Sequence, residues 1–228
     1  MPFHIQCLKE LLFLCVIVFP SAYIFFLKPF VLPKGDRLLA ENLSTVIVYG
    51  ALTAFGVLTG SAGEAAPLPG AILFVLAAAL GIANVGMEYV EAALPILKRN
   101  GSLPRLRPAS IYKGTFSPVK FLSIIAAAAA EELVFRQFMI GGILNALHAP
   151  LWLAVLLSSF FYALNHVYFG RFAVLQKMTS GLVFSLLYVC SGGSVAVSAL
   201  CHICQNLFLY FYSLDRGKPA AQRKEAAS

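Results

Sequence analysis

Three groups of polar residues at helical spacing stand inside apolar stretches of this chain. They are Glu131, Glu132 and Arg136, then Tyr162 and His166, then His202 and Asn206. Residues at i and i+4 share one face of a helix. Ionisable groups at membrane depth are costly and usually mark function. A carboxylate, two imidazoles and an amide can supply what peptide hydrolysis needs: a base for water and donors for the developing oxyanion.

The first group separates into a structural and a functional part. Glu132 and Arg136 can form an ion pair across one turn, and a structural salt bridge explains both. It does not explain Glu131, which lies about 100° round the helix and has no local partner. Glu131 follows the expected helix start by about 12 residues, or roughly 18 Å at 1.5 Å per residue, which is near mid-bilayer. Glu131 is therefore a candidate general base.

The two cysteines around His202 raise the question of a metal site. Cys201 and Cys204 form a C-x-x-C, but they share one helix face while His202 and Asn206 share another. The four side chains cannot all reach one ion, so a cysteine-based metal site is not predicted. His4 and His148 carry no interpretation.

Glu88 and Glu91 lie three residues apart near the end of a long apolar stretch. One interpretation is a charged helix end that pairs with Lys or Arg. The functional alternative is that both carboxylates line a substrate entrance.

The elements that must position these residues are transmembrane helices. The 228 residues are 60% hydrophobic and 12% charged, and five are Cys. This composition excludes a soluble globular enzyme, a disordered chain and a disulfide scaffold. It predicts an all-α fold with one integral membrane domain over 1–228. A span needs about 20 apolar residues, and we expect seven: 11–30, 43–60, 69–97, 119–147, 150–169, 172–190 and 194–212.

Pro20 predicts a kink in the first span, which we expect to be a retained helix rather than a signal peptide. Every Lys and Arg except Lys9 and Arg136 lies in or beside the loops that follow spans one, three and five, or in the C-terminal tail. This alternation predicts an outer N-terminus and a polar cytoplasmic tail over 215–228. Because the charge is not gathered on one face, nucleic acid is not an expected partner.

The order of the motifs resembles the CPBP family of intramembrane proteases, which includes the type II CAAX-prenyl endopeptidases. The family pattern is EExxxR, FxxxH and HxxxN on successive helices, and the resemblance covers roughly 118–212 as the catalytic core. One position departs from the pattern, because Tyr162 stands where the family has Phe. The first three spans carry none of these motifs.

The resemblance implies a role for each matched residue, in a conical cavity within the bundle that we expect to open toward the cytoplasm. Glu131 matches the glutamate that activates water, and His166 the histidine that helps to position and deprotonate it. His202 and Asn206 match the pair that stabilises the oxyanion. Glu132, Arg136 and Tyr162 match supporting positions around the site.

Two questions of chemistry stay open at this point. Glu131, His166 and His202 could also form a zinc ligand set, although a metal-free glutamic mechanism is the favoured expectation for the family. The leading hypothesis is an endopeptidase that cuts a membrane-associated, lipidated or sorted protein. The alternatives are a non-catalytic adaptor or immunity protein on the same fold and a proton-coupled carrier. The small size suggests a bacterial plasma-membrane protein.

Overall fold

The computed structural model describes residues 3–31, 36–60, 66, 68–105 and 115–217. Within these ranges the chain is helical and contains no strand, which confirms the all-α prediction. The elements are α1 Phe3–Ile17, α2 Pro20–Val31, α3 Arg37–Leu58, α4 Ala71–Asn100, α5 Pro118–Glu132, the π-helix η2 Leu133–Ile140, α6 Gly141–Leu147, α7 Leu151–Leu164, the 3-10 turn η3 Val167–Phe169, α8 Arg171–Cys190 and α9 Val195–Gly217.

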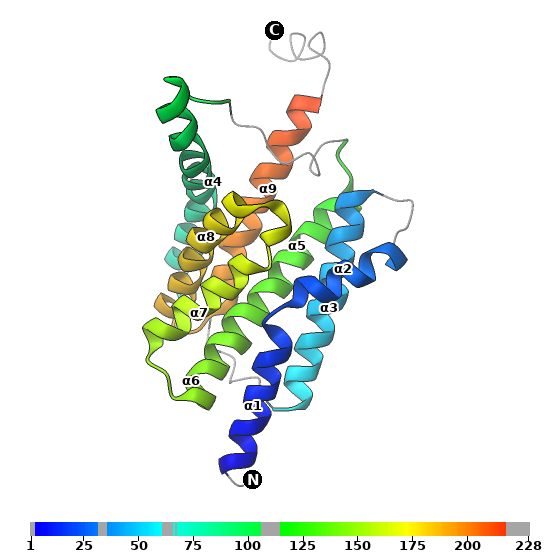
Figure 1. The fold of residues 1–228 in the computed structure, drawn as a ribbon, viewed down its shortest axis with the longest axis vertical. Helices are drawn as coiled ribbons and strands as arrows, with labels where there is room; N and C mark the ends of the chain where they lie inside the picture. Colours follow the sequence, from blue (N-terminus) through cyan, green and yellow to red (C-terminus); the bar gives the residue numbers. More distant parts are fainter. Residues whose placement is uncertain (1–2, 32–35, 61–65, 67, 106–114, 218–228) are drawn as a thin grey trace.

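Four of the described helices are long and apolar enough to cross a membrane, or five if the bent pair α1 and α2 is one span. The count of about seven is therefore not confirmed by length and composition. α7 has 14 residues, fewer than a span needs. The path α5–η2–α6 runs helically from Pro118 to Leu147 but changes its hydrogen-bond pattern on the way. In Figure 1 the successive connections lie toward alternate ends of the bundle.

The predicted kink at Pro20 is a break. The first part of this helix pair ends at Ile17, α2 begins at Pro20, and their axes differ by 52°. Asn165 satisfies the backbone groups that the break frees: its side chain donates to the carbonyl of Val18 and accepts from the amide of Ser21. The break is thus tied to the residue that precedes His166.

The functional helices form a curved row. α3 packs on α5, α5 on α9 and α9 on α4, while α7 and α8 pack together beside them (Figure 1). Close approach of α4 to α9 depends on Gly81, because a Cβ there would lie 2.3 Å from the carbonyl oxygen of Cys201. α4 has 30 residues and, like α9, extends past α8 at the end of the molecule where the C-terminus lies (Figure 1).

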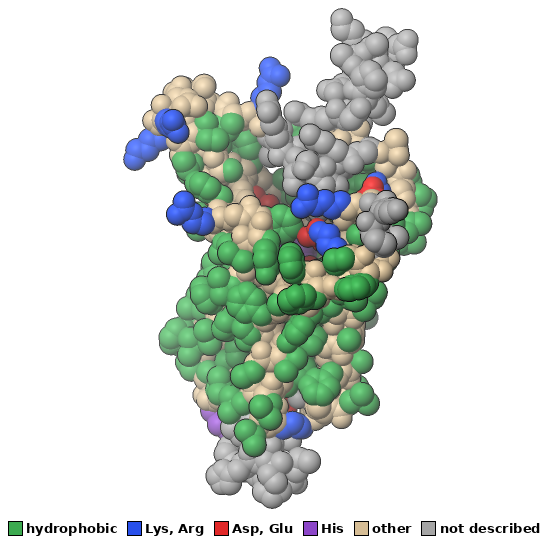
Figure 2. Space-filling view, turned by 45° about the vertical axis from the view of Figure 1, so that its right-hand side comes forward, with side chains coloured by type: hydrophobic (Ala, Val, Ile, Leu, Met, Phe, Trp, Pro, Cys, Tyr) green, Lys and Arg blue, Asp and Glu red, His purple; other side chains and the backbone are tan. Residues whose placement is uncertain are grey.

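The surface agrees with an integral membrane protein. Hydrophobic side chains cover most of the face shown in Figure 2, and Lys and Arg gather mainly toward the end where the C-terminus lies. Several basic residues that were expected in loops lie in helices instead. They are Lys28 near the end of α2, Lys98 and Arg99 in the last turn of α4, Lys120 in the first turn of α5 and Lys177 in the second turn of α8. Lys34, Arg107, Lys113 and the tail from residue 218 onward lie outside the described residues.

Candidate active site

Glu131 and Glu132 stand at the end of α5. This helix begins at Pro118, with Ser117 as its N-cap, and proline is favoured in the first turn because its missing N–H is not needed there. Directly after Glu132 the chain changes from α to π geometry over Leu133–Ile140. The sequence analysis expected one regular helix here. π-helical segments within α-helices frequently occur at functional sites. The π-helix that starts beside Glu131 and Glu132 therefore supports a functional role for this pair.

The predicted ion pair between Glu132 and Arg136 is confirmed. Arg136 Nε lies 3.0 Å from Glu132 Oε2, and both side chains are fully buried. Arg136 Nη1 also donates to Ser158 Oγ at 2.9 Å, and its guanidinium lies 5.2 Å from the ring centre of Tyr162. A buried ion pair needs such additional contacts, because removing two charges from water is costly.

Glu132 also reaches His202, a contact that the sequence analysis missed. His202 Nδ1 lies 3.0 Å from Glu132 Oε1, so one carboxylate connects Arg136 on η2 with the histidine on α9. The Glu132 carboxylate, which pairs with Arg136, accepts the hydrogen on Nδ1. The other ring nitrogen, Nε2, is therefore left to face Tyr162 and Glu131, at 3.4 Å from the Tyr162 hydroxyl oxygen.

Glu131 has a much looser environment than its neighbour. Its Oε2 lies 4.0 Å from His202 Nε2, and its side chain is 18% exposed. No hydrogen bond to this carboxylate is found within the described part of the chain. Glu131 therefore faces open space with an available carboxylate.

His166 lies in the turn after α7, which corrects the expectation of a helix that continues to residue 169. α7 ends at Leu164 because the chain tightens into η3. The i,i+4 relation survives, since His166 Nδ1 lies 3.0 Å from the carbonyl oxygen of Tyr162. A carbonyl can only accept, so Nδ1 carries the proton and Nε2 of the neutral ring is free to accept one.

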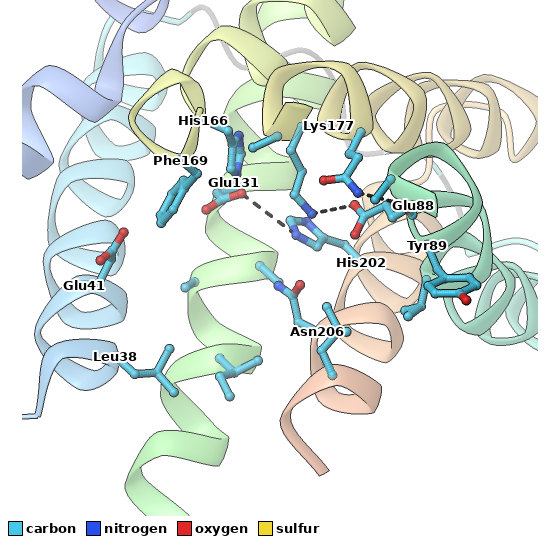
Figure 3. Close-up of a pocket in the computed structure, with 18 of the residues that line it drawn as sticks. Leu38, Glu41, Glu88, Tyr89, Glu131, His166, Phe169, Lys177, His202 and Asn206 are labelled. Atoms are coloured by element: carbon cyan, nitrogen blue, oxygen red, sulfur yellow. Dashed lines mark hydrogen bonds and ion pairs between the residues drawn. The ribbon is translucent and has the colours of Figure 1, made fainter. Parts of the chain in front are cut away.

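The predicted catalytic residues meet at one cavity of about 870 Å³, called the large cavity below. Glu131, Tyr162, His166, His202 and Asn206 all line it, together with residues of α3, α4 and α8. Figure 3 shows Glu131 near His166, with His202 and Asn206 reaching toward them from α9. Glu132 and Arg136 are not among the lining residues; both lie behind the wall.

Both interpretations of Glu88 describe part of what the structure contains. Its Oε1 lies 2.7 Å from Lys177 Nζ and accepts from Ser180 and Gln205 at 2.8 Å. Glu88 and Lys177 also line the large cavity. Glu91 instead accepts from Thr179 at 2.6 Å. Gln205 could have been noticed in the sequence, since it is a polar residue beside Asn206 in an apolar helix.

The ring nitrogens of the two histidines bear on the zinc alternative, which stays a prediction. Within the described residues, no group of three or more His, Cys, Asp or Glu is arranged to hold a metal ion. Glu132 occupies Nδ1 of His202 and the Tyr162 carbonyl occupies Nδ1 of His166. Each ring could therefore offer only its Nε2 to a ligand set with Glu131.

Comparisons with known proteins give one result. No curated protein and no solved structure matches the chain. Residues 114–208, less than half of the chain, match the family model described as type II CAAX prenyl endopeptidase Rce1-like. This region contains all three motifs. The match confirms that this region resembles the CPBP family of CAAX proteases.

Proposed function

We propose that this chain is a metal-free intramembrane endopeptidase that hydrolyses a peptide bond of a membrane-associated, lipidated or sorted protein. The observation that carries the proposal is the convergence of Glu131, His166 and His202 from three separate helical segments on one cavity. A scaffold needs no loosely held carboxylate at the wall of a cavity. The family match at 114–208 supports the same reaction class.

In the first step, Glu131 and His166 activate water. Glu131 takes one proton from the water. Nε2 of His166 accepts a hydrogen bond from the other O–H of the water and so orients its oxygen. The oxygen then attacks the peptide carbonyl carbon and forms a tetrahedral intermediate. Positioned acid–base groups of this kind contribute about 10²–10⁴-fold to rate.

In the second step, His202 and Asn206 stabilise the oxyanion. His202 holds Glu132 through Nδ1–H, and in its imidazolium form it would also present Nε2–H toward the large cavity, where the Asn206 amide supplies a second donor. Donors fixed before the reaction cost no reorganisation when charge develops. The C–N bond then breaks as the proton held by Glu131 passes to the leaving amine.

We further propose that the chain crosses the plasma membrane seven times, with the N-terminus outside and the C-terminus in the cytoplasm. The shorter α7 and the broken α1–α2 pair are two of these crossings. The gathering of Lys and Arg toward the C-terminal end of the molecule supports this orientation. The large cavity would then open toward the cytoplasm, where water can reach it.

The test is a comparison of protein termini in membranes from cells that express either the wild type or Glu131→Gln at matched levels. Termini found with the wild type alone would identify the substrate and the cleaved bond. Identical termini, with the biological phenotype kept in the variant, would favour an adaptor on the same fold. The purified wild type should then cut a peptide that contains the identified bond, both with and without a chelator. Purified Glu131→Gln should not cut this peptide.

A further inference from the structure

A second, smaller cavity of about 240 Å³ reaches the same catalytic residues from the other side. Five residues line both this small cavity and the large cavity: Glu41, Thr45, Glu131, His166 and Phe169. The rest of the small cavity comes from α2, from α3 and from the segment that follows α7. In Figure 3 Phe169 lies between Glu41 on α3 and the Glu131–His166 pair. The reacting groups are therefore accessible from two directions.

The lining of the small cavity is suited to water. Ser21, Thr45 and the buried Tyr49 bring three hydroxyl groups to it. Ser21 is 9% exposed, and its Oγ has no hydrogen-bond partner among the described residues. A buried hydroxyl without a protein partner is the kind of group that an ordered water satisfies. The volume has room for several water molecules.

The small cavity also has a polar rim at the basic end of the molecule. Lys28 and Arg37 line it, and Lys28 Nζ forms an ion pair with Glu41 Oε2 at 2.6 Å. Asn165 fixes the opposite wall, since its bond to the Ser21 amide places the start of α2 beside His166. The small cavity is thus a built feature of the α1–α2 break.

We propose that the small cavity is a water-filled route that supplies the hydrolytic water to Glu131 and His166 while a substrate occupies the large cavity. This inference rests on the proposed function. Hydrolysis inside a bilayer needs a path by which water reaches the catalytic residues, because a bound apolar substrate excludes water from the cavity that it fills. A separate polar route removes this conflict, since water arrives on the side of Glu131 that the substrate does not cover.

The first experiment measures hydration and does not depend on proteolysis. Hydroxyl radicals generated by radiolysis of water would be used to oxidise the purified protein, and mass spectrometry would read two buried tyrosines. Tyr49, 2% exposed, lines the small cavity; Tyr210, 1% exposed, lines neither cavity. We expect oxidation at Tyr49 and none at Tyr210. An unmodified Tyr49 in the wild type would overturn the proposal.

A matched pair of variants locates the water. Ser21→Leu fills the small cavity, whereas Ser21→Ala removes the hydroxyl and leaves the space open. We expect Tyr49 oxidation to be lost in Ser21→Leu and kept in Ser21→Ala. Equal oxidation of Tyr49 in both variants would mean that the water reaches it by another path, which overturns the route. If Ser21→Leu does not fold, the wild-type comparison of Tyr49 with Tyr210 still decides.

Kinetics then test the supply of water to the reaction. With a peptide that contains the identified bond, we expect Ser21→Leu to lower kcat by about tenfold with KM unchanged, because the substrate still binds in the large cavity. A raised KM with unchanged kcat would mean that the small cavity holds part of the peptide, and the water route would be wrong. If the wild type does not cut the peptide, the proposed function is contradicted. The oxidation of Tyr49 would still show whether water fills the small cavity.

Discussion

Two of the partly buried carboxylates that line the large cavity, Glu88 and Glu131, are held very differently. Glu88 on α4 accepts from Lys177, Ser180 and Gln205 within 2.8 Å, so α4, α8 and α9 are tied together through one oxygen. Glu131 on α5 has its closest basic group, His202 Nε2, at 4.0 Å. The same side-chain type thus holds three donors on one wall of the cavity and faces open space on the other.

The difference separates a structural role from a catalytic one. A carboxylate that holds three protein donors on one oxygen is fixed in place, and moving it toward a water would break those bonds. A carboxylate with free lone pairs can accept a proton from water, but it contributes little to the packing of its neighbours. Glu132 extends the comparison within one turn, since it is bonded to both Arg136 and His202. A position beside the cavity therefore does not by itself identify the base. The carboxylate that accepts no hydrogen bond from the described residues, Glu131, is the better candidate.

The largest expected effect is the loss of turnover in Glu131→Gln. The amide keeps the shape of the side chain but cannot take a proton, so we expect kcat to fall by about 10²–10⁴-fold. The thermal unfolding midpoint in detergent should stay close to that of the wild type, because Glu131 bonds little. Steady-state cleavage and a melting curve on the same preparation check both parts. A well-folded variant with unchanged kcat would remove Glu131 from the mechanism.

Glu132→Ala should fail in a different way. It leaves Arg136 buried without its partner and frees His202, and breaking a buried pair costs about 3–5 kcal/mol. We expect loss of folded protein, measured as the monodisperse fraction after extraction, rather than clean inactivation. Folded but inactive Glu132→Ala would show that Glu132 acts in the chemistry instead.

Glu88→Gln makes the same chemical change as Glu131→Gln, but at the carboxylate that holds three protein donors. It is therefore the matched control. Lys177 loses its counter-charge, and we expect destabilisation by about 1–3 kcal/mol with kcat of the folded protein nearly unchanged. Adding Lys177→Met should recover part of the lost stability, because no unpaired charge then remains. Complete loss of turnover in stable Glu88→Gln would erase the distinction between the two carboxylates.

Much of this site could be predicted from the sequence because its signal is local. The pairs Glu132–Arg136 and His202–Asn206 follow helical spacing, and membrane depth makes each polar residue conspicuous. Long-range contacts carry no such signal. That His202 bonds to Glu132, and that Asn165 closes the break before Ser21, depends on how distant helices pack. The π-helix after Glu132 and the early end of α7 were missed for a related reason, since apolar periodicity does not record a change of helix type.

The smallest expected effect concerns Tyr162, where the family pattern has Phe. Its hydroxyl oxygen lies 3.4 Å from His202 Nε2, which is long for a hydrogen bond, while its ring packs against Arg136 and His166. Tyr162→Phe keeps the ring and the carbonyl that fixes His166. A weak hydrogen bond of about 1 kcal/mol corresponds to roughly fivefold, so we expect kcat/KM to change by no more than that.

Tyr188→Phe is the control for the loss of a hydroxyl, because Tyr188 bonds to Gln137 at 3.3 Å and does not line the large cavity. It should leave kcat/KM unchanged. A loss well beyond tenfold in Tyr162→Phe alone would mean that the hydroxyl itself donates to the reacting carbonyl. The chain would then hold the oxyanion with a group that the family pattern lacks, and His202 would depend on Tyr162 as well as on Glu132. A small loss would leave Glu132 as the residue that sets the orientation of His202, with Glu131 free to act as the base.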